Sequence, residues 1–322
     1  MTAITPSQLH PRLSQIAMAV KPEGMLADIV CPRIPVEAES FRYTIFAEDM
    51  FFNIPDTKIG RKSEANQVEF GGSLIDASTF DYGLDDFVPT KDIDNAQSQL
   101  SGIDPLAMAT EGTTILVDLA RERRVATLMQ TAGNFAAGLK QTLSGTSQWS
   151  DTTNSTPMKD IMDAMDLMLV RPNVLILGRA VATALSRHPQ IVAAIYGRTG
   201  VGAVGSASGI VSMPALAELF GLKGVYVGET FFNAAKPGQA ATMSRLWGKH
   251  ATLARIDTSV RNLRSPAMPT FVGTAEWQGR RVRTWMEEKN GIDGGTMVRV
   301  AEQVNELLLW QNAGYLFTNA VA

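Results

Sequence analysis

The sequence predicts an α+β fold in which extended segments surround one long helix and a compact α/β unit. Three patterns indicate this class. Prolines interrupt the first 40 residues, an almost unbroken helical pattern covers 104–133, and short helices alternate with buried strands after residue 157. The 322 residues, 45% of them hydrophobic, are enough for two packed domains or for one domain with large extensions.

Composition excludes several classes of protein. The 29 basic and 32 acidic side chains give a net charge of -3, too weak a field to hold nucleic acid or an anionic membrane tightly. No apolar run reaches the roughly 18 residues that cross a bilayer, and the N-terminus lacks the pattern of an export signal. The single cysteine, Cys31, cannot form an internal disulfide, which is typical of a reducing cytoplasm and of a buried structural thiol. We therefore expect a soluble protein with no membrane partner.

Residues 1–40 are predicted to form an N-terminal arm. Their prolines exclude a long helix or a central strand. These prolines are Pro6, Pro11, Pro22, Pro32 and Pro35. Such a segment cannot bury much of its apolar surface against itself, so we expect the arm to lie on the rest of the chain or on a neighbouring molecule.

Residues 41–88 are predicted to form an extended β-hairpin loop. β-rich runs at 41–46 and 66–70, with a later run at 79–82, flank a polar, turn-rich segment at 53–64. A two-stranded ribbon is marginally stable alone in water, so this hairpin needs a surface to lie against. An ordinary edge hairpin on a local sheet is the alternative. Intersubunit contact is assigned to the charged residues of the tip, Asp56, Lys58, Arg61, Lys62 and Glu64.

A long helix, the spine helix, is predicted at 104–133, within the segment 89–156. Asp104 is a good N-cap and Pro105 a good first helical residue, and about 28 residues would span roughly 42 Å. One apolar stripe is expected to be buried, and it comprises Met108, Ile115, Leu116, Leu119, Ala126 and Met129. The charged side is expected to face solvent or another subunit, because interleaved acids argue against a nucleic-acid site. It carries Asp118, Arg121, Glu122 and Arg124.

A compact α/β unit is predicted at 157–270, after a loop at 138–155 that is rich in Ser, Thr and Gly. Its pattern alternates helices at 158–169, 180–187, 189–196 and 214–220 with strands at 174–177, 224–228 and 251–256. The C-terminal strands of 271–322 follow this unit and are expected to return beside the spine helix. They cover 281–287, 296–310 and 315–317.

The sequence carries no arrangement of catalytic or metal-binding residues. Glycines at 200–205 match the string of a dinucleotide-binding loop, but they follow a helix instead of a strand and favour a mobile loop. His10, His188 and His250 lie in separate segments without the spacing of zinc ligands, and His188 is interpreted as a helix-break residue. The sequence therefore predicts no enzyme activity, no metal and no cofactor.

Four groups of residues carry a resemblance to a known family: 27–36, then 82–105 with 121–126, then 171–178, and finally 314–321. In this order they resemble the arm-to-hairpin passage, the hairpin return with the spine helix, the first strand of the axial domain and the closing strand. The proteins that they resemble are the major capsid proteins of tailed phages with the HK97-type fold, and the resemblance covers nearly the whole chain.

The resemblance implies that residues 157–270 form an axial domain, and that residues 89–156 form a peripheral domain to which the C-terminal strands of 271–322 return. It also implies an icosahedral shell of hexamers and pentamers, built from copies of this chain around packaged double-stranded DNA. It implies a place in the virion capsid and assembly in the host bacterial cytoplasm. Portal, scaffolding and decoration proteins are further implied partners, and contact with the DNA is expected to be weak and non-specific. Some members crosslink covalently through a lysine, an asparagine and a carboxylate. Nothing in the sequence identifies partners for Lys58 or Lys62, so we predict no crosslink.

Two alternatives remain open at the level of sequence. One is an encapsulin-like compartment, which resembles the same fold but encloses protein cargo. The other is an α/β enzyme with a nucleotide site at the glycine loop. In the favoured hypothesis the arm and the hairpin gain their stability only by lying across sister molecules.

Overall fold

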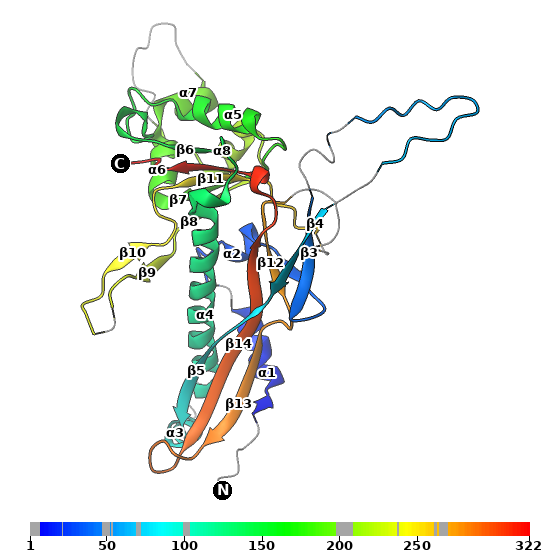
Figure 1. Ribbon diagram of the computed structural model, residues 1–322. Helices are drawn as coiled ribbons and strands as arrows, with labels where there is room; N and C mark the ends of the chain where they lie inside the picture. The colour runs from blue at the N-terminus through cyan, green and yellow to red at the C-terminus, as the bar shows by residue number, and fades with distance from the viewer. Residues whose placement is uncertain are drawn as a thin grey trace.

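The computed structural model describes residues 7–20, 22–46, 52, 54–68, 72–98, 104–197, 209–236, 238–260, 263 and 270–322. The chain forms an elongated body with an α/β unit at one end and a long twisted sheet crossed by one helix at the other (Figure 1). Two thin segments project from this body. The glycine string at 200–205 lies outside the described residues.

The long helix α4 (Pro105–Gln130) begins where the sequence predicts. The Asp104 side chain accepts hydrogen bonds from the Leu106 and Ala107 N–H groups (3.0 and 3.4 Å), and Pro105 takes the first helical position, where it loses no helical hydrogen bond. The helix ends three residues before the predicted limit of 133. No helix in the described part of the chain is long and apolar enough to cross a bilayer.

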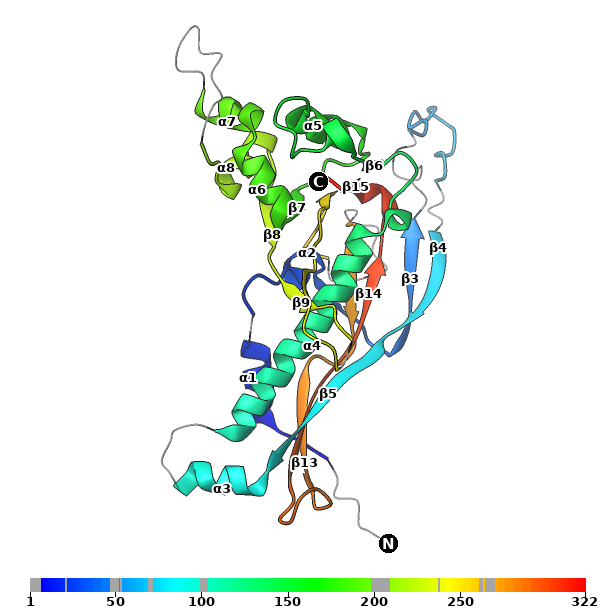
Figure 2. The same ribbon diagram turned by 90° about the vertical axis from the view of Figure 1, so that its left-hand side faces the viewer.

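A six-stranded sheet lies under α4 (Figure 2). Its central strand β14 (Gly295–Leu308) pairs on one edge with β13 (Arg281–Glu287) and β12 (Val272–Glu276), and on the other with β5 (Phe80–Pro89). Two short N-terminal strands, β1 (Gln8–Leu9) and β2 (Arg33–Pro35), complete it. Strands β12 to β14 therefore return beside the spine helix, as predicted.

The face that α4 buries differs from the predicted one over its first half. Met108, Ile115 and Leu116 are exposed, whereas Thr110, Thr113, Thr114 and Val117 are buried. The three threonine hydroxyls each donate to a carbonyl four residues earlier at 2.7 Å, so they bring no unsatisfied polar group into the interior. Ala126 and Met129, in the second half, are buried as predicted.

The α/β unit is built on a second sheet with the order β6-β15-β11-β7-β8. These strands are β6 (Lys140–Thr142), β15 (Gly314–Thr318), β11 (Ala251–Ala254), β7 (Val174–Gly178) and β8 (Gly224–Gly228). Its helices are α5 (Pro157–Leu167), α6 (Arg179–Arg187), α7 (Pro189–Tyr196) and α8 (Met213–Phe220). Every residue of β7 is buried, as expected for a central strand that is apolar throughout.

Two segments of the chain lie elsewhere than predicted. The closing strand β15 pairs with β11 and β6 in the α/β sheet instead of returning beside α4. Leu143 and Trp149, assigned to the peripheral domain, are buried in the core of the α/β unit. Their N–H groups donate to Thr318 O (3.0 Å) and Ala320 O (2.7 Å), which ties this loop to the C-terminus. The predicted limits at 156 and 271 therefore do not follow the packing.

The N-terminal arm is folded onto its own chain. It contains two short helices, α1 (Pro11–Ala19) and α2 (Ala27–Val30), and Pro11 takes the first position of α1. Leu13, at the centre of α1, packs in one buried cluster with Val117 of α4 and Val282 of β13. The hypothesis that the arm gains stability only across sister molecules is therefore wrong.

Two hairpins and several short elements remain. Strand β3 (Ser40–Phe46) pairs with β4 (Gly72–Ser78); residues 66–68 form no strand, and 69–70 lie outside the described residues. Tyr43 packs against Ala275 and Leu307, so the hairpin base rests on its own body. The second hairpin joins β9 (Phe231–Asn233) to β10 (Met243–Arg245). The other helices are α3 (Thr90–Ser98), η2 (Ala132–Asn134), η3 (Gly145–Ser147) and η4 (Gln311–Ala313).

Candidate assembly surfaces

The hairpin tip, residues 54–68, stands away from the body (Figure 1). Its hydrogen bonds are short-range: the Lys58 N–H donates to Asp56 Oδ1 (2.9 Å), and Asn66 Nδ2 donates to Asp56 O (2.7 Å). All five charged residues predicted to lie at the tip are exposed there. The described side chains of the tip are therefore not covered by their own chain and are accessible to solvent or to another molecule.

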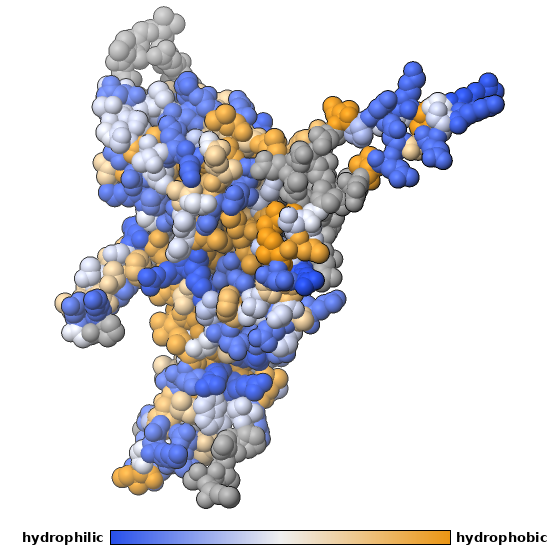
Figure 3. All heavy atoms as spheres, in the orientation of Figure 1, coloured by the Kyte–Doolittle hydropathy of each residue, from blue (hydrophilic) through white to orange (hydrophobic). Residues whose placement is uncertain are grey.

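Apolar side chains are exposed on the same tip. Ile54 is 97% exposed, and Ile59 and Val68 are also exposed, among mostly hydrophilic neighbours (Figure 3). Burying an isoleucine side chain is worth roughly 1.5–3 kcal/mol. The combination of large aliphatic groups and charges of both signs is typical of a surface that a partner covers.

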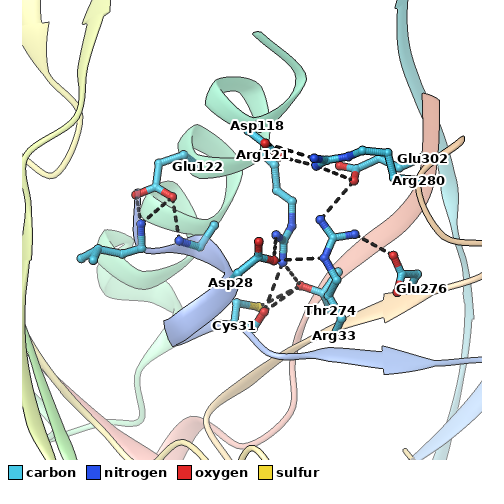
Figure 4. Close-up of polar contacts among 12 residues, drawn as sticks. Asp28, Cys31, Arg33, Asp118, Arg121, Glu122, Thr274, Glu276, Arg280 and Glu302 are labelled. Atoms are coloured by element: carbon cyan, nitrogen blue, oxygen red, sulfur yellow. Dashed lines mark hydrogen bonds and ion pairs between the residues drawn. The ribbon is translucent and has the colours of Figure 1, made fainter. Parts of the chain in front are cut away.

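The four charged residues predicted on the spine helix do not face solvent or a neighbour. Arg121 is 1% exposed and Glu122 0%, and Asp118 and Arg124 are largely covered by other parts of the same chain. Figure 4 shows Asp118, Arg121 and Glu122 pointing toward residues of other elements. The prediction of an exposed charged face was wrong, because this face meets complementary charges on the arm and on the sheet.

Arg121 joins the arm to the sheet. Its guanidinium pairs with Asp28 of α2, and Nη2 donates to Cys31 O and to Thr274 Oγ1 of β12, both at 3.2 Å (Figure 4). A side chain of α4 thus holds one end of α2 and the middle of β12 together.

Glu302 of β14 is the second junction. Its Oε2 accepts from Arg33 Nη2 (3.1 Å) and Arg280 Nη2 (3.2 Å). Arg33 Nη1 also donates to Glu276 Oε1 (2.6 Å), and Arg280 pairs with Asp118 on α4. Each buried carboxylate of this cluster therefore has an arginine partner, which is the condition for burying such charges without a large penalty.

Arg124 extends the same cluster toward β5. It donates from Nε and Nη2 to the two carboxylate oxygens of Glu306, at 3.0 and 2.9 Å. Its guanidinium also lies 3.6 Å from the centre of the Tyr82 ring. The bidentate pair and the ring fix this side chain between α4, β14 and β5.

The arginines oppose the effect of burial on the pKa of the carboxyl groups that they contact. Burial raises the pKa of Asp28, but the Arg121 and Arg33 guanidinium groups outweigh it and lower that pKa to about 2. For Glu302, burial is likewise outweighed by Arg33, Arg280 and Arg121, so its pKa is lowered. For Asp118, burial outweighs Arg280 and the pKa is raised.

Glu122 is a separate polar junction, and it forms no ion pair within the described part of the chain. Oε1 accepts from the Leu26 N–H (2.8 Å) and from Trp247 Nε1 (2.6 Å), and Oε2 accepts from the Leu26 and Ala27 N–H groups (3.0 and 2.7 Å). Burial outweighs these donors and raises the pKa of Glu122. One carboxylate therefore joins α4, the start of α2 and the segment between β10 and β11.

The described residues offer little for catalysis. No group of three or more His, Cys, Asp and Glu side chains among them could hold a metal ion. His188 is buried and caps α7: Nδ1 accepts from the Gln190 N–H (3.4 Å), and Nε2 lies 3.1 Å from Ser155 Oγ. Because Ser155 Oγ also lies within hydrogen-bonding distance of Asp151 O (2.6 Å), this pair satisfies local backbone groups. His188 therefore lies at the break between α6 and α7, as predicted.

Sequence reasoning missed four residues of the charge cluster: Arg33 on β2, Glu276 on β12, Glu302 on β14, and Arg280, which directly precedes β13. A signal was present, because Glu302 lies on β14 between the buried valines Val298 and Val300 on one side and Val304 on the other. A charge at such a position needs a buried partner. The sequence spacing between Arg33 and Glu302, however, gave no indication that they meet.

No family model matches the chain. A curated major capsid protein of Pseudomonas phage JBD67 is 43% identical over 320 residues, which cover 98% of each protein. The crystal structure of a phage-related protein from Bordetella bronchiseptica RB50 superposes with a TM-score of 0.74 at 21% identity, over 98% of each chain. The capsid structure of Cyanophage P-SCSP1u superposes with a TM-score of 0.55 at 9% identity, over 93% of this chain and 89% of that one.

These similarities differ in what they establish. The two solved structures are too distant in sequence to show more than a shared fold, a mixed α/β fold found in a phage capsid. The relative from Pseudomonas phage JBD67 matches along its whole length, so the likeness includes the arm, the hairpin and both sheets. The chain therefore belongs to the phage major capsid proteins.

Proposed function

We propose that copies of this chain assemble into an icosahedral shell of hexamers and pentamers that encloses the double-stranded DNA genome of a phage. In this proposal the fold is of the HK97 type, the α/β unit is the axial domain, and the long sheet with α4 is the peripheral domain. The observation that carries it is the hairpin tip, which presents Ile54 and five charged side chains beyond its own body.

The tip acts as an extension that a neighbouring copy covers. Residues 54–68 bury no large apolar side chain on their own chain, so their contribution to stability comes from the neighbour. Burial of Ile54 and Ile59 there is worth roughly 1.5–3 kcal/mol each before ordering costs. The charged residues of the tip set the register of that contact, because like charges placed opposite each other across an interface repel. These residues are Asp56, Lys58, Arg61, Lys62 and Glu64.

The buried charge cluster serves the assembly indirectly. It fixes the arm, α4 and the sheet into one body, so each subunit presents its extensions in a constant geometry. The protein works as a structural subunit of the virion capsid and has no catalytic part. Assembly takes place in the host bacterial cytoplasm, and the net charge of -3 lets packaged DNA lie near the shell with weak contact only.

Replacement of the tip tests this function. A variant in which residues 53–65 are replaced by a flexible Gly/Ser segment of equal length keeps the base of the β3–β4 hairpin and the Tyr43 contact. We expect the wild-type protein to form closed particles in electron microscopy, and the variant to keep its circular dichroism spectrum while forming none. Intact shells from the variant would refute the role of the tip, and a wild-type protein that stays monomeric would refute the function.

A further inference from the structure

The β9–β10 ribbon is a second projection with one uncovered face. Phe231 lies opposite Arg245 and Asn233 opposite Met243, so these four side chains share one face of the ribbon. Phe232 points to the other face, where Arg123 of α4 lies 5.6 Å from its ring. The shared face is exposed: Phe231 is 46% and Met243 63% exposed, and Arg245 lies over the Phe231 ring at 4.3 Å. A two-stranded ribbon of this length is marginal without further contact.

Strand β5 offers an uncovered edge in the long sheet. Among the described residues it pairs with β14 alone, so its second edge has no strand partner. One face of β5 is turned toward α4, because Tyr82 on that face lies against Arg124. Residues two apart on a strand share a face, so this face also carries Phe80, Leu84 and Asp86. Phe80 is 53% and Leu84 42% exposed, and Asp86 is exposed and forms no ion pair within the described part of the chain.

The two surfaces are complementary in chemistry. The ribbon combines aromatic and aliphatic side chains with the cations Arg245 and Lys236, whereas the β5 edge combines Phe80 and Leu84 with the anion Asp86. Neither surface complements itself. Two ribbons in contact would place cations opposite cations, and two β5 edges would place anions opposite anions. A contact between unlike surfaces on identical chains is heterologous. Repetition of such a contact closes a ring when the rotation between copies closes, as it does in a hexamer or pentamer, and gives an open filament when it does not.

We propose that the exposed face of the β9–β10 ribbon of one copy docks against the open edge of β5 in the adjacent copy, with Arg245 opposite Asp86. The inference rests on the proposed function, since it needs copies to assemble, and it names a contact separate from that of the hairpin tip. Aliphatic and aromatic contact between the two surfaces provides the burial, and the Arg245–Asp86 pair fixes which edge is chosen.

Charge reversal and exchange test the pair. Arg245→Asp and Asp86→Arg should each lower the yield of particles by roughly tenfold or more, because each places like charges at the contact. The double variant with both changes should restore the yield to within about twofold of wild type. The matched control combines Asp86→Arg with reversal of an exposed lysine elsewhere, Lys289→Asp, and should restore nothing. Wild-type yields from either single variant, or a double variant no better than the single ones, would overturn the contact.

Introduced cysteines give an independent measurement. The native Cys31 is buried, so a chain with Arg245→Cys and Asp86→Cys carries only two reactive thiols. Mild oxidation of its particles should give a ladder of dimers, trimers and larger multimers on non-reducing gels, as a heterologous contact requires. Dimers alone, or monomers in particles that are otherwise intact, would contradict this contact and leave the proposed function standing. Failure of the wild-type chain to form particles would instead contradict the proposed function.

Discussion

Replacing Glu122 with alanine removes one acceptor that three buried N–H donors share. These donors are the Leu26 and Ala27 backbone groups and Trp247 Nε1. A buried donor left without a partner costs about 1–3 kcal/mol, so the structure sets a range of about 3–9 kcal/mol. We expect a loss of about 3–5 kcal/mol, because the short helix α2 can shift and regain water at its first turn. This is a large part of the roughly 5–15 kcal/mol that typically stabilises a domain.

Two further variants sharpen the test. Glu122→Gln keeps the size of the side chain and one carbonyl acceptor, but its amide group also directs N–H donors toward the site. We expect it to lose about half as much stability as Glu122→Ala. Glu111 lies on the same helix but is exposed, so Glu111→Ala should change the free energy of unfolding by no more than about 0.5 kcal/mol.

Guanidinium unfolding, followed by far-UV circular dichroism and tryptophan fluorescence, measures these differences. The emission of Trp247 should also shift to longer wavelength in Glu122→Ala, because its indole loses its carboxylate partner and admits water. A loss below about 1 kcal/mol for Glu122→Ala, matching the Glu111→Ala control, would refute the claim that this carboxylate holds the arm and the β10–β11 segment on α4.

Three other predictions concern buried or paired titratable groups. The pKa of Asp28 is lowered from 3.8 to about 2, so the stability that Asp28 contributes is present above pH 3.8 and is lost as the pH falls toward 2. Asp28→Asn should therefore reduce the dependence of the free energy of unfolding on pH over that range. The reduction should be small, because the Asp28 side chain is 63% exposed and solvent screens its ion pairs. Burial lowers the pKa of His188 below 6.5, so the free energy of unfolding should fall as the pH drops below 6.5. His188→Asn preserves an N-cap and should remove this dependence of the melting temperature on pH. An unchanged dependence would contradict the role of His188. Glu302→Ala leaves Arg33 and Arg280 without their shared carboxylate and should cost about 3–5 kcal/mol in chemical denaturation, against no measurable loss for the exposed Glu288→Ala.

Local signals gave much of the fold. The Asp104-Pro105 pair marked the start of α4, and the apolar run at 174–177 marked the buried strand β7 of the α/β sheet. The cap satisfies N–H groups within three residues, and a fully buried strand must be apolar throughout, so both features are written in adjacent residues.

Long-range partners could not be predicted in the same way. Thr110, Thr113 and Thr114 appear polar in sequence, yet their hydroxyls are satisfied inside α4, and this frees their methyl groups for burial. Arg121 and Glu122 appear exposed because their partners, Asp28 and Trp247, are distant in sequence. The prediction of the helix was confirmed, whereas the face it buries over its first half was wrong because that face depends on contacts across the chain.

The hairpin, too, was predicted in its local features but not in its contacts. Its two strands pair from Ser40 opposite Ser78 to Phe46 opposite Gly72, so the second strand begins at Gly72 and not at the predicted residue 66. The assignment of Asp56, Lys58, Arg61, Lys62 and Glu64 to intersubunit contact stays a prediction, because a contact between copies is a property of the assembly.

Cryo-electron microscopy of particles formed by the wild-type chain tests the central claim most directly. We expect closed shells in which residues 54–68 of each copy lie on the surface of an adjacent copy, with Ile54 buried there and the arm still folded on its own α4. Particles whose tips are fully solvated, or a protein that remains a monomer at every concentration examined, would contradict it.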